Sequence, residues 1–165
     1  MITDLKKDAC FEILSNNYIG HLAYVYNNTP YVIPITYFYD KAYIRVICYT
    51  GEGHKTTALR ANGSVALEVA EIESIDHYRT VLVHGTFEEL EGLDAKYQLH
   101  KFTLGVKDLI SENDHKKVNF IPEFSGKTHP EAQPIVYHIK IQEITGMEKL
   151  PLSEYLSSHV ENETN

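Results

Sequence analysis

Hydrophobic and polar positions alternate with a period of two along much of the chain, which is typical of β-strands with one buried face. In segment 64–72, for example, Val65, Leu67 and Val69 point one way, whereas Ala66 and Glu68 point the other way. Similar runs, bounded by turn residues, predict six strands, at 18–26, 31–39, 42–49, 64–72, 78–90 and 135–144. Gly85 interrupts the fifth of these strands and predicts a bulge or a close backbone approach.

Helical spacing of apolar residues is confined to the segments between these strands. It predicts helices at 8–16, 56–61 and 93–104, and a further helix from residue 153 that leads into a frayed end. Segment 108–134 is polar and poorly periodic, and it predicts no element.

The order of these elements indicates the fold class. Short turns at 27–30 and 40–41 join neighbouring strands, and βαβ repeats are missing. This pattern favours a mainly β barrel or an α+β fold over a doubly wound sheet. The 165 residues suit a single domain, with a barrel core at about 10–150 and a C-terminal helix and tail at 151–165.

Charge and composition narrow the classes of function. The net charge is −8, from 15 basic and 23 acidic residues, which disfavours nucleic-acid binding and requires a local positive site for any anion. No apolar run approaches the roughly 18 residues of a membrane span, and the N-terminus lacks a signal-peptide core. Cys10 and Cys48 have no metal-ligand spacing, so we expect two buried thiols in a reducing, cytoplasmic setting.

The segment from Tyr49 to Lys55 carries the strongest candidate chemistry. It joins a predicted strand to a predicted helix through Gly51 and Gly53, which we expect to permit a sharp turn and a close ligand approach. A helix start with unpaired backbone N–H groups, next to His54 and Lys55, is a plausible phosphate cradle. The spacing matches neither a Walker loop nor the G-x-G-x-x-G dinucleotide motif. The alternative is a turn that leads into a surface helix.

The order of motifs resembles a known family over about residues 10–150. The motifs are YIGHLA at 18–23, PYVIPITY at 30–37, GHK at 53–55, ALRAN at 58–62, VALEV at 65–69, YRTVLVHG at 78–85 and IQEITGM at 141–147. Together they resemble the flavin-binding split-barrel family of the pyridoxamine 5'-phosphate oxidase type, and within it the branch of nitroimidazole-resistance proteins. The resemblance implies a six-stranded antiparallel split barrel that forms a homodimer, with FMN, or alternatively FAD, at the subunit interface.

The resemblance also implies which residues meet the cofactor. It places a strand backbone beside the isoalloxazine ring, the glycine turn at the phosphate, and His84 on a strand close to the cofactor. Tyr49 stands where the family commonly has a serine, and Thr50 is expected to supply the missing hydroxyl. The implied cofactor-binding residues are Pro34, Ile35, Thr36, Tyr37, Tyr49, Thr50, Gly53, His54, Lys55 and His84.

Several of these residues have ordinary alternatives. The resemblance to the nitroimidazole-resistance branch implies that the histidine of the Gly-His-Lys triplet lies next to the cofactor or substrate. His54 is therefore the candidate catalytic residue, able to bind an anion or supply a proton. It could instead be a turn histidine in water, Lys55 a surface lysine, and His84 a half-buried structural histidine. Arg60 is either a solvated arginine or a phosphate contact. The remaining histidines lack metal-ligand spacing, so we expect no metal site.

The leading interpretation is therefore an FMN-dependent oxidoreductase with a small-molecule substrate, nitroaromatic compounds being candidates, and with a reduced nicotinamide as the candidate electron donor. The alternatives are a flavin-binding module without turnover and a haem-handling split barrel. A hydrolase is unsupported, because the sequence lacks a G-x-S-x-G motif.

Overall fold

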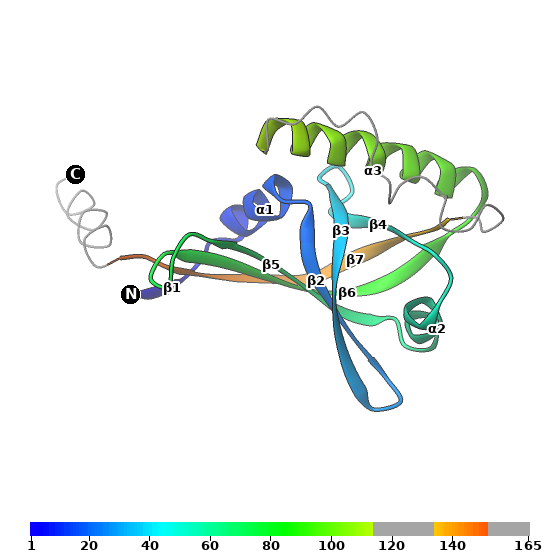
Figure 1. Ribbon diagram of the computed structural model, residues 1–165, viewed down its shortest axis with the longest axis horizontal. Helices are drawn as coiled ribbons and strands as arrows, with labels where there is room; N and C mark the ends of the chain where they lie inside the picture. The colour runs from blue at the N-terminus through cyan, green and yellow to red at the C-terminus, as the bar shows by residue number, and fades with distance from the viewer. Residues whose placement is uncertain (114–133, 152–165) are drawn as a thin grey trace.

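The computed structural model describes residues 1–113 and 134–151. Its helices are α1 (Lys7–Asn16), α2 (His54–Ala61) and α3 (Gly92–Asn113). Its strands are β1 (Ile2–Asp4), β2 (Ile19–Tyr26), β3 (Thr29–Asp40), β4 (Arg45–Thr50), β5 (Ser64–Ile72), β6 (Tyr78–Leu90) and β7 (Ile135–Lys149). Figure 1 shows these elements in order along the chain.

Six of the strands close into a barrel. They pair in the order β7-β4-β3-β2-β5-β6, and β6 pairs back onto β7, so that each of the six has two neighbours. All pairings are antiparallel. The six-stranded antiparallel barrel predicted from the sequence is thus confirmed. β1 was not predicted, because three residues are too few to show a period; it adds to β7 outside the ring, with Ile2 opposite Lys149.

The barrel interior is filled by the inward residues of the alternating strands. The predicted inward row of β5, Val65, Leu67 and Val69, is buried there as expected. Helix α1 packs against β3, β5, β6 and β7 and adds Ile13 and Leu14 to the same core. Both cysteine thiols are free and buried, as predicted.

Helix α3 covers the outer side of β3, β4 and β7 and forms a second apolar cluster (Figure 1). Phe102 and Val106 of α3 are buried there with Ile47 and Val136. Helix α3 was predicted to end near residue 104 and instead runs to Asn113, because Val106 and Ile110 continue its packed face. No helix in the described part of the chain is long and apolar enough to cross a membrane.

Gly105 brings α3 into close contact with Phe38. A Cβ atom at Gly105 would lie 2.1 Å from Cε2 of the Phe38 ring. Helix propensity alone predicts that Gly105→Ala stabilises the protein by about 1 kcal/mol. We expect the opposite, a loss of about 1–3 kcal/mol, because overpacking moves the ring or the helix. Urea unfolding of the wild type and Gly105→Ala measures whether the free energy of unfolding rises or falls.

Gly51→Ala is the matched control for this glycine, because a Cβ at Gly51 meets nothing within 4 Å. Its effect on the free energy of unfolding is expected to be small. A stabilised Gly105→Ala protein would show that the helix does not pack as tightly as described.

Local details explain the other differences from the predicted strands. β4 begins at Arg45 rather than at residue 42, because residues 41–44 form a turn in which Ile44 has a φ of 50°. The predicted irregularity at Gly85 is confirmed: the β6–β7 register shifts between His84 and Gly85, and a Cβ at Gly85 would lie 2.6 Å from the Lys140 carbonyl oxygen. The predicted helix from residue 153 and most of segment 108–134 lie outside the described residues.

Candidate cofactor site

The barrel opens where β3 and β4 separate. β3 pairs with β2 from Thr29 to Thr36, but with β4 only from Tyr37 to Asp40. Within the described chain, residues 29–36 therefore have a strand on one side only (Figure 1). Because backbone groups of a strand alternate in direction, this edge presents free N–H and C=O groups. The predicted cofactor residues Pro34, Ile35 and Thr36 all lie on it.

Helix α2 begins on the other side of this opening, after the glycine turn. His54 and Lys55 are its first two residues, rather than part of the preceding loop as predicted. The N–H of Gly53 donates to Thr56 Oγ1 at 2.9 Å, and that hydroxyl lies 2.8 Å from the Gly53 carbonyl. The first-turn N–H groups of the helix have no intrahelical acceptor and are oriented to bind an anion.

The glycines of this turn do not play the expected backbone role. Gly53 has a φ of 168°, which is ordinary extended backbone, and Gly92 is the glycine with positive φ in the described residues. The turn therefore does not use the left-handed backbone that favours glycine, and the predicted close approach of a ligand stays a prediction. A Cβ at either position would meet nothing within 4 Å, so open space lies beside the turn.

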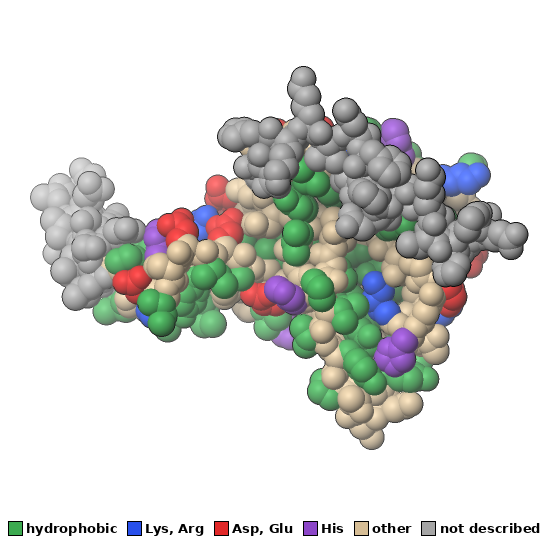
Figure 2. Space-filling model, in the orientation of Figure 1, with side chains coloured by type: hydrophobic (Ala, Val, Ile, Leu, Met, Phe, Trp, Pro, Cys, Tyr) green, Lys and Arg blue, Asp and Glu red, His purple; other side chains and the backbone are tan. Residues whose placement is uncertain are grey.

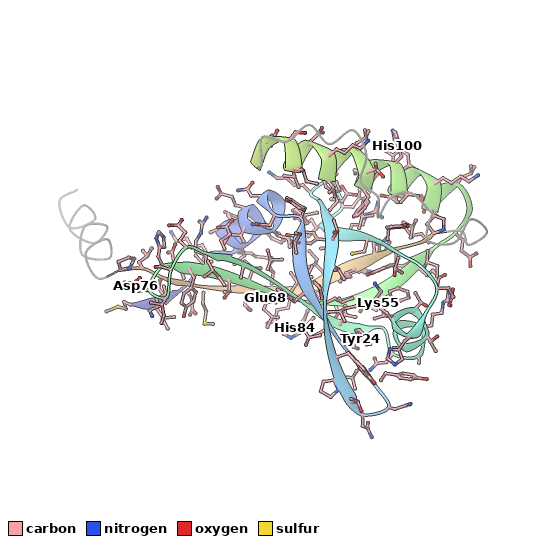
Figure 3. All side chains as sticks on the ribbon, viewed as in Figure 1. Tyr24, Lys55, Glu68, Asp76, His84 and His100 are labelled. Atoms are coloured by element: carbon pink, nitrogen blue, oxygen red, sulfur yellow. The ribbon has the colours of Figure 1, made fainter. Side chains whose placement is uncertain are left out.

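Lys55 is a half-buried cation without a counter-charge in the described part of the chain. Within the described residues, its ammonium forms no ion pair and no hydrogen bond to another side chain, and burial lowers its pKa. Cys48 lies near enough to interact with it, and burial raises the pKa of that thiol to about 12, so the thiol is uncharged at neutral pH. Figure 3 labels Lys55 at the start of α2, and Figure 2 shows a basic side chain recessed in the same part of the view.

Arg60, in contrast, is fully engaged. Its guanidinium pairs with Glu52 at 2.5 and 3.1 Å and with Glu89 at 2.7 and 2.8 Å. Two carboxylates balance its charge and occupy its donors, which gives no support to a phosphate contact by Arg60. The sequence did not reveal this pairing, since Glu89 is 29 residues away.

His54 packs against three tyrosines of the β2–β3 hairpin. Its ring centroid is 4.8 Å from that of Tyr31 and 5.4 Å from that of Tyr26, with the Tyr26 ring edge-on at 88°. The hydroxyl of Tyr24 lies 3.5 Å from His54 Nδ1. The sequence showed a tyrosine-rich hairpin and a candidate histidine, but no local pattern connects residues about 25 positions apart.

Tyr37 differs from the other predicted residues of β3, because its side chain is buried. Its hydroxyl donates to the Leu14 carbonyl at 3.0 Å, and its backbone N–H donates to the Tyr18 carbonyl at 2.8 Å. Burial raises the pKa of Tyr37 far above its usual range. A ligand on this strand would therefore meet the backbone edge and the outward Pro34 and Thr36, rather than the Tyr37 phenol.

Tyr49 and Thr50, the two predicted cofactor residues at the end of β4, have side chains in different surroundings. The Tyr49 ring lies 6.4 Å from Phe102 and belongs to the cluster beneath α3. Thr50 Oγ1 is 3.3 Å from the Gly51 carbonyl, so its hydroxyl stays at the turn. Thr56 and Thr57 were not predicted as site residues, yet their hydroxyls bond to the Gly53 carbonyl and hold the turn against the helix.

His84 lies on the outer wall of the barrel and is exposed, rather than half-buried. Its Nδ1 is 3.7 Å from a carboxylate oxygen of Glu143. On the same wall, His21 Nδ1 is 3.0 Å from Glu68; Figure 3 labels Glu68 and His84. Across residues 1–113 and 134–151, no three His, Cys, Asp or Glu side chains are grouped as a metal site requires.

The outer wall formed by β2, β3, β5 and β6 exposes large apolar side chains. The register places Val32, Ala23, Ala66 and His84 in one row across the four strands. The exposed fractions are 65% for Val32, 55% for Ile19, 43% for Val25 and 37% for Leu82. Such a patch on one side of a barrel is typical of a contact surface.

Comparisons with known proteins agree with this architecture. The sequence matches the family described as pyridoxamine 5'-phosphate oxidase over residues 6–148. An uncharacterized protein of Rhizobium meliloti (strain 1021) is 29% identical over 102 residues, which cover 61% of this chain and 66% of that protein, slightly less than two thirds of its length.

Two solved structures show the same fold. A FAD-binding protein from Mesorhizobium loti has a TM-score of 0.70 at 23% identity, covering 92% of this chain and 98% of its own. A candidate 5-nitroimidazole antibiotic resistance protein from Bacteroides thetaiotaomicron VPI-5482 has a TM-score of 0.65 at 15% identity, covering 90% and 87%. At these identities the likeness shows a shared fold, and the split barrel predicted from the sequence is confirmed.

Proposed function

Because the chain belongs to the pyridoxamine 5'-phosphate oxidase family, we propose that it binds a flavin in the opening between β3 and β4 and acts as an oxidoreductase on small organic acceptors. The flavin phosphate is held by Lys55 and the first turn of α2. The ring system lies along the free backbone edge of β3, next to Pro34, Ile35 and Thr36. The flavin-binding description of the Mesorhizobium loti protein supports the ligand class.

The observation that carries this proposal is the unpaired ammonium of Lys55. A half-buried cation without a counter-ion costs stability, so a fold retains it where a ligand completes the pair. A phosphate group carries about −1.5 to −2 charges at neutral pH and accepts several hydrogen bonds. The N–H groups of the first turn of α2 supply further donors at the same place.

FMN fits these residues better than FAD. Among the described residues around the turn, Lys55 is the cation without a carboxylate partner, whereas Arg60 is balanced by Glu52 and Glu89. One free cation and one helix start match a single phosphate group. The two glutamates beside the turn would repel a second phosphate.

The chemistry follows from what the residues offer. A bound flavin supplies hydride and electron transfer, and the protein supplies position and electrostatics. His54 is exposed beside the phosphate turn and is the candidate proton donor to a reduced substrate. We propose a reduced nicotinamide as electron donor and nitroaromatic compounds as acceptors. The free thiols of Cys10 and Cys48 support a reducing, cytoplasmic setting.

We further propose that the protein is a homodimer, joined through the apolar outer wall of β2, β3, β5 and β6. A second copy would cover Val32, Ile19 and Leu82, which a monomer leaves in water. This contact would also bring His84 into the interface. Sedimentation that shows only monomer at micromolar concentration would contradict the proposal.

An absorbance spectrum of the protein purified without added cofactor tests which ligand it binds. The activity is tested by adding a reduced nicotinamide, which should bleach the flavin absorbance, and then a nitroimidazole, which should restore it. Flavin absorbance with turnover supports the proposal. A protein that shows flavin absorbance but does not oxidise reduced nicotinamide, whichever acceptor is added, would be a flavin-binding module without turnover. A Soret band would indicate a haem protein.

The pH dependence of FMN affinity provides an independent prediction. Protonated Lys55 holds the phosphate and neutral Lys55 does not, so affinity falls as pH rises through the pKa of Lys55. Because burial lowers this pKa from 10.5, the fall begins at a lower pH than for a lysine in water. Fluorescence titrations across alkaline pH should show the fall in the wild type and a flat profile in Lys55→Met. Parallel profiles would contradict the assignment.

A further inference from the structure

The three tyrosines around His54 form a rigid group. The rings of Tyr24 and Tyr31 are stacked, with centroids 5.2 Å apart and planes at 11°. Tyr24 is only 4% exposed and belongs to the barrel core. Tyr26 and Tyr31 pack against that core from the two strands of the hairpin. Together, Tyr24, Tyr26 and Tyr31 are named here the tyrosine clamp.

The hairpin that carries the clamp is itself well defined. β2 and β3 pair continuously from Ile19 opposite Thr36 to Tyr26 opposite Thr29. A two-residue turn at Asn27 and Asn28, with φ values of 49° and 59°, closes the hairpin as a type I′ turn does. Its end extends past the β5 pairing, which stops at Tyr24, and reaches α2 (Figure 1).

Helix α2, by comparison, follows a turn whose side-chain hydrogen bonds are local, from Thr56 and Thr57 to the Gly53 carbonyl. Gly51 and Gly53 have no side chains, and the space next to them is open. Ala58 and Leu59 anchor the body of the helix in the barrel core, Arg60 holds its far end, and Thr56 caps its start locally. The His54 side chain joins the first turn of the helix to the β2–β3 hairpin.

We propose that the tyrosine clamp and His54 are positioning residues, which fix the first turn of α2 so that Lys55 and the helix N–H groups meet the cofactor phosphate. This inference rests on the proposed function. It concerns the phosphate end of the ligand alone, because the ring system would lie on the backbone of β3. The clamp therefore sets how strongly the protein prefers a phosphorylated flavin over the same flavin without phosphate.

The test compares FMN with riboflavin, which differ only by the phosphate. His54→Ala, Tyr31→Leu and the double variant are titrated with both ligands, and Tyr97→Leu on α3, an exposed tyrosine, is the matched control. We expect each single variant to weaken FMN binding about fivefold or more, because misplacing a charged contact loses much of its strength. Riboflavin affinity is expected to be unchanged, as is FMN affinity in Tyr97→Leu.

The double variant distinguishes positioning from separate contacts. If His54 and Tyr31 act as one unit, the FMN affinity of the double variant equals that of the single variant with the larger loss. Additive losses would overturn the inference, as would equal losses for FMN and riboflavin, which would make the clamp merely structural. If Tyr31→Leu fails to fold, His54→Ala and Tyr24→Phe, which removes only the hydroxyl near His54 Nδ1, answer the same question.

Failure of the inference and failure of the proposed function give different results. If the wild type binds FMN and riboflavin equally, the phosphate site itself is absent and the proposed function is wrong. If the wild type prefers FMN and every clamp variant keeps that preference, the proposed function stands and the positioning role is overturned.

Discussion

Lys55→Met is expected to weaken FMN binding at least tenfold, about 1.4 kcal/mol or more, and to make the ligand-free protein more stable. The affinity falls because a charge-assisted contact to the phosphate is lost. The stability rises because a half-buried, unpaired ammonium is replaced by an apolar side chain of similar length. The two effects have opposite signs, which an ordinary surface lysine would not show.

FMN titration and urea unfolding of the same preparations measure both effects. Lys41→Met, at an exposed lysine in the turn after β3, is the matched control and should change neither quantity. Unchanged FMN affinity in Lys55→Met would remove Lys55 from the site. A destabilised ligand-free variant would show that the ammonium has a favourable partner without the cofactor.

Asp40→Asn is expected to destabilise the protein by about 2–3 kcal/mol. Asp40 is 1% exposed, and its carboxylate pairs with Arg45 at 3.1 Å and with Lys101 at 2.6 Å. Arg45 in turn lies 3.5 Å from His138, whose other ring nitrogen is 2.8 Å from Glu88. Removing one charge of a buried pair leaves its partners uncompensated, although the partial exposure of Lys101 reduces the cost.

This network ties α3 to β3, β4 and β7, so its loss should lower cooperativity as well as stability. Glu68→Gln breaks the exposed pair with His21 and serves as the control, with an expected cost of less than about 1 kcal/mol. Equal losses in the free energy of unfolding for Asp40→Asn and Glu68→Gln would show that the buried Asp40 network does not stabilise the fold more than an exposed ion pair.

Much of the barrel could be predicted from the sequence, because each strand buries one face and so shows a period of two. Val65, Leu67 and Val69 are an example, and the irregularity at Gly85 was also predictable from a glycine within a strand. β1 could not be predicted, since it depends on pairing with a strand more than 140 residues later. Ile44 delays the start of the predicted strand to Arg45, through a backbone angle that its residue type does not suggest.

The candidate site was predictable only in part. A strand, a glycine turn, a cation and a helix start are consecutive in sequence, so Lys55 could be identified as an anion-binding candidate. The contacts that modify this prediction join distant segments: Arg60 with Glu89, His54 with Tyr31, and Tyr37 with Leu14. Such contacts depend on how the barrel closes, and no short pattern encodes them.

Whether Lys55 holds a flavin phosphate is measured directly by the affinities of the wild type and of Lys55→Met for FMN and riboflavin at neutral pH. The wild type should bind FMN at least tenfold more tightly than riboflavin. Lys55→Met should lose at least tenfold of that FMN affinity and keep the riboflavin affinity of the wild type. A wild type that binds neither ligand, or that binds both with the same affinity, would contradict the claim.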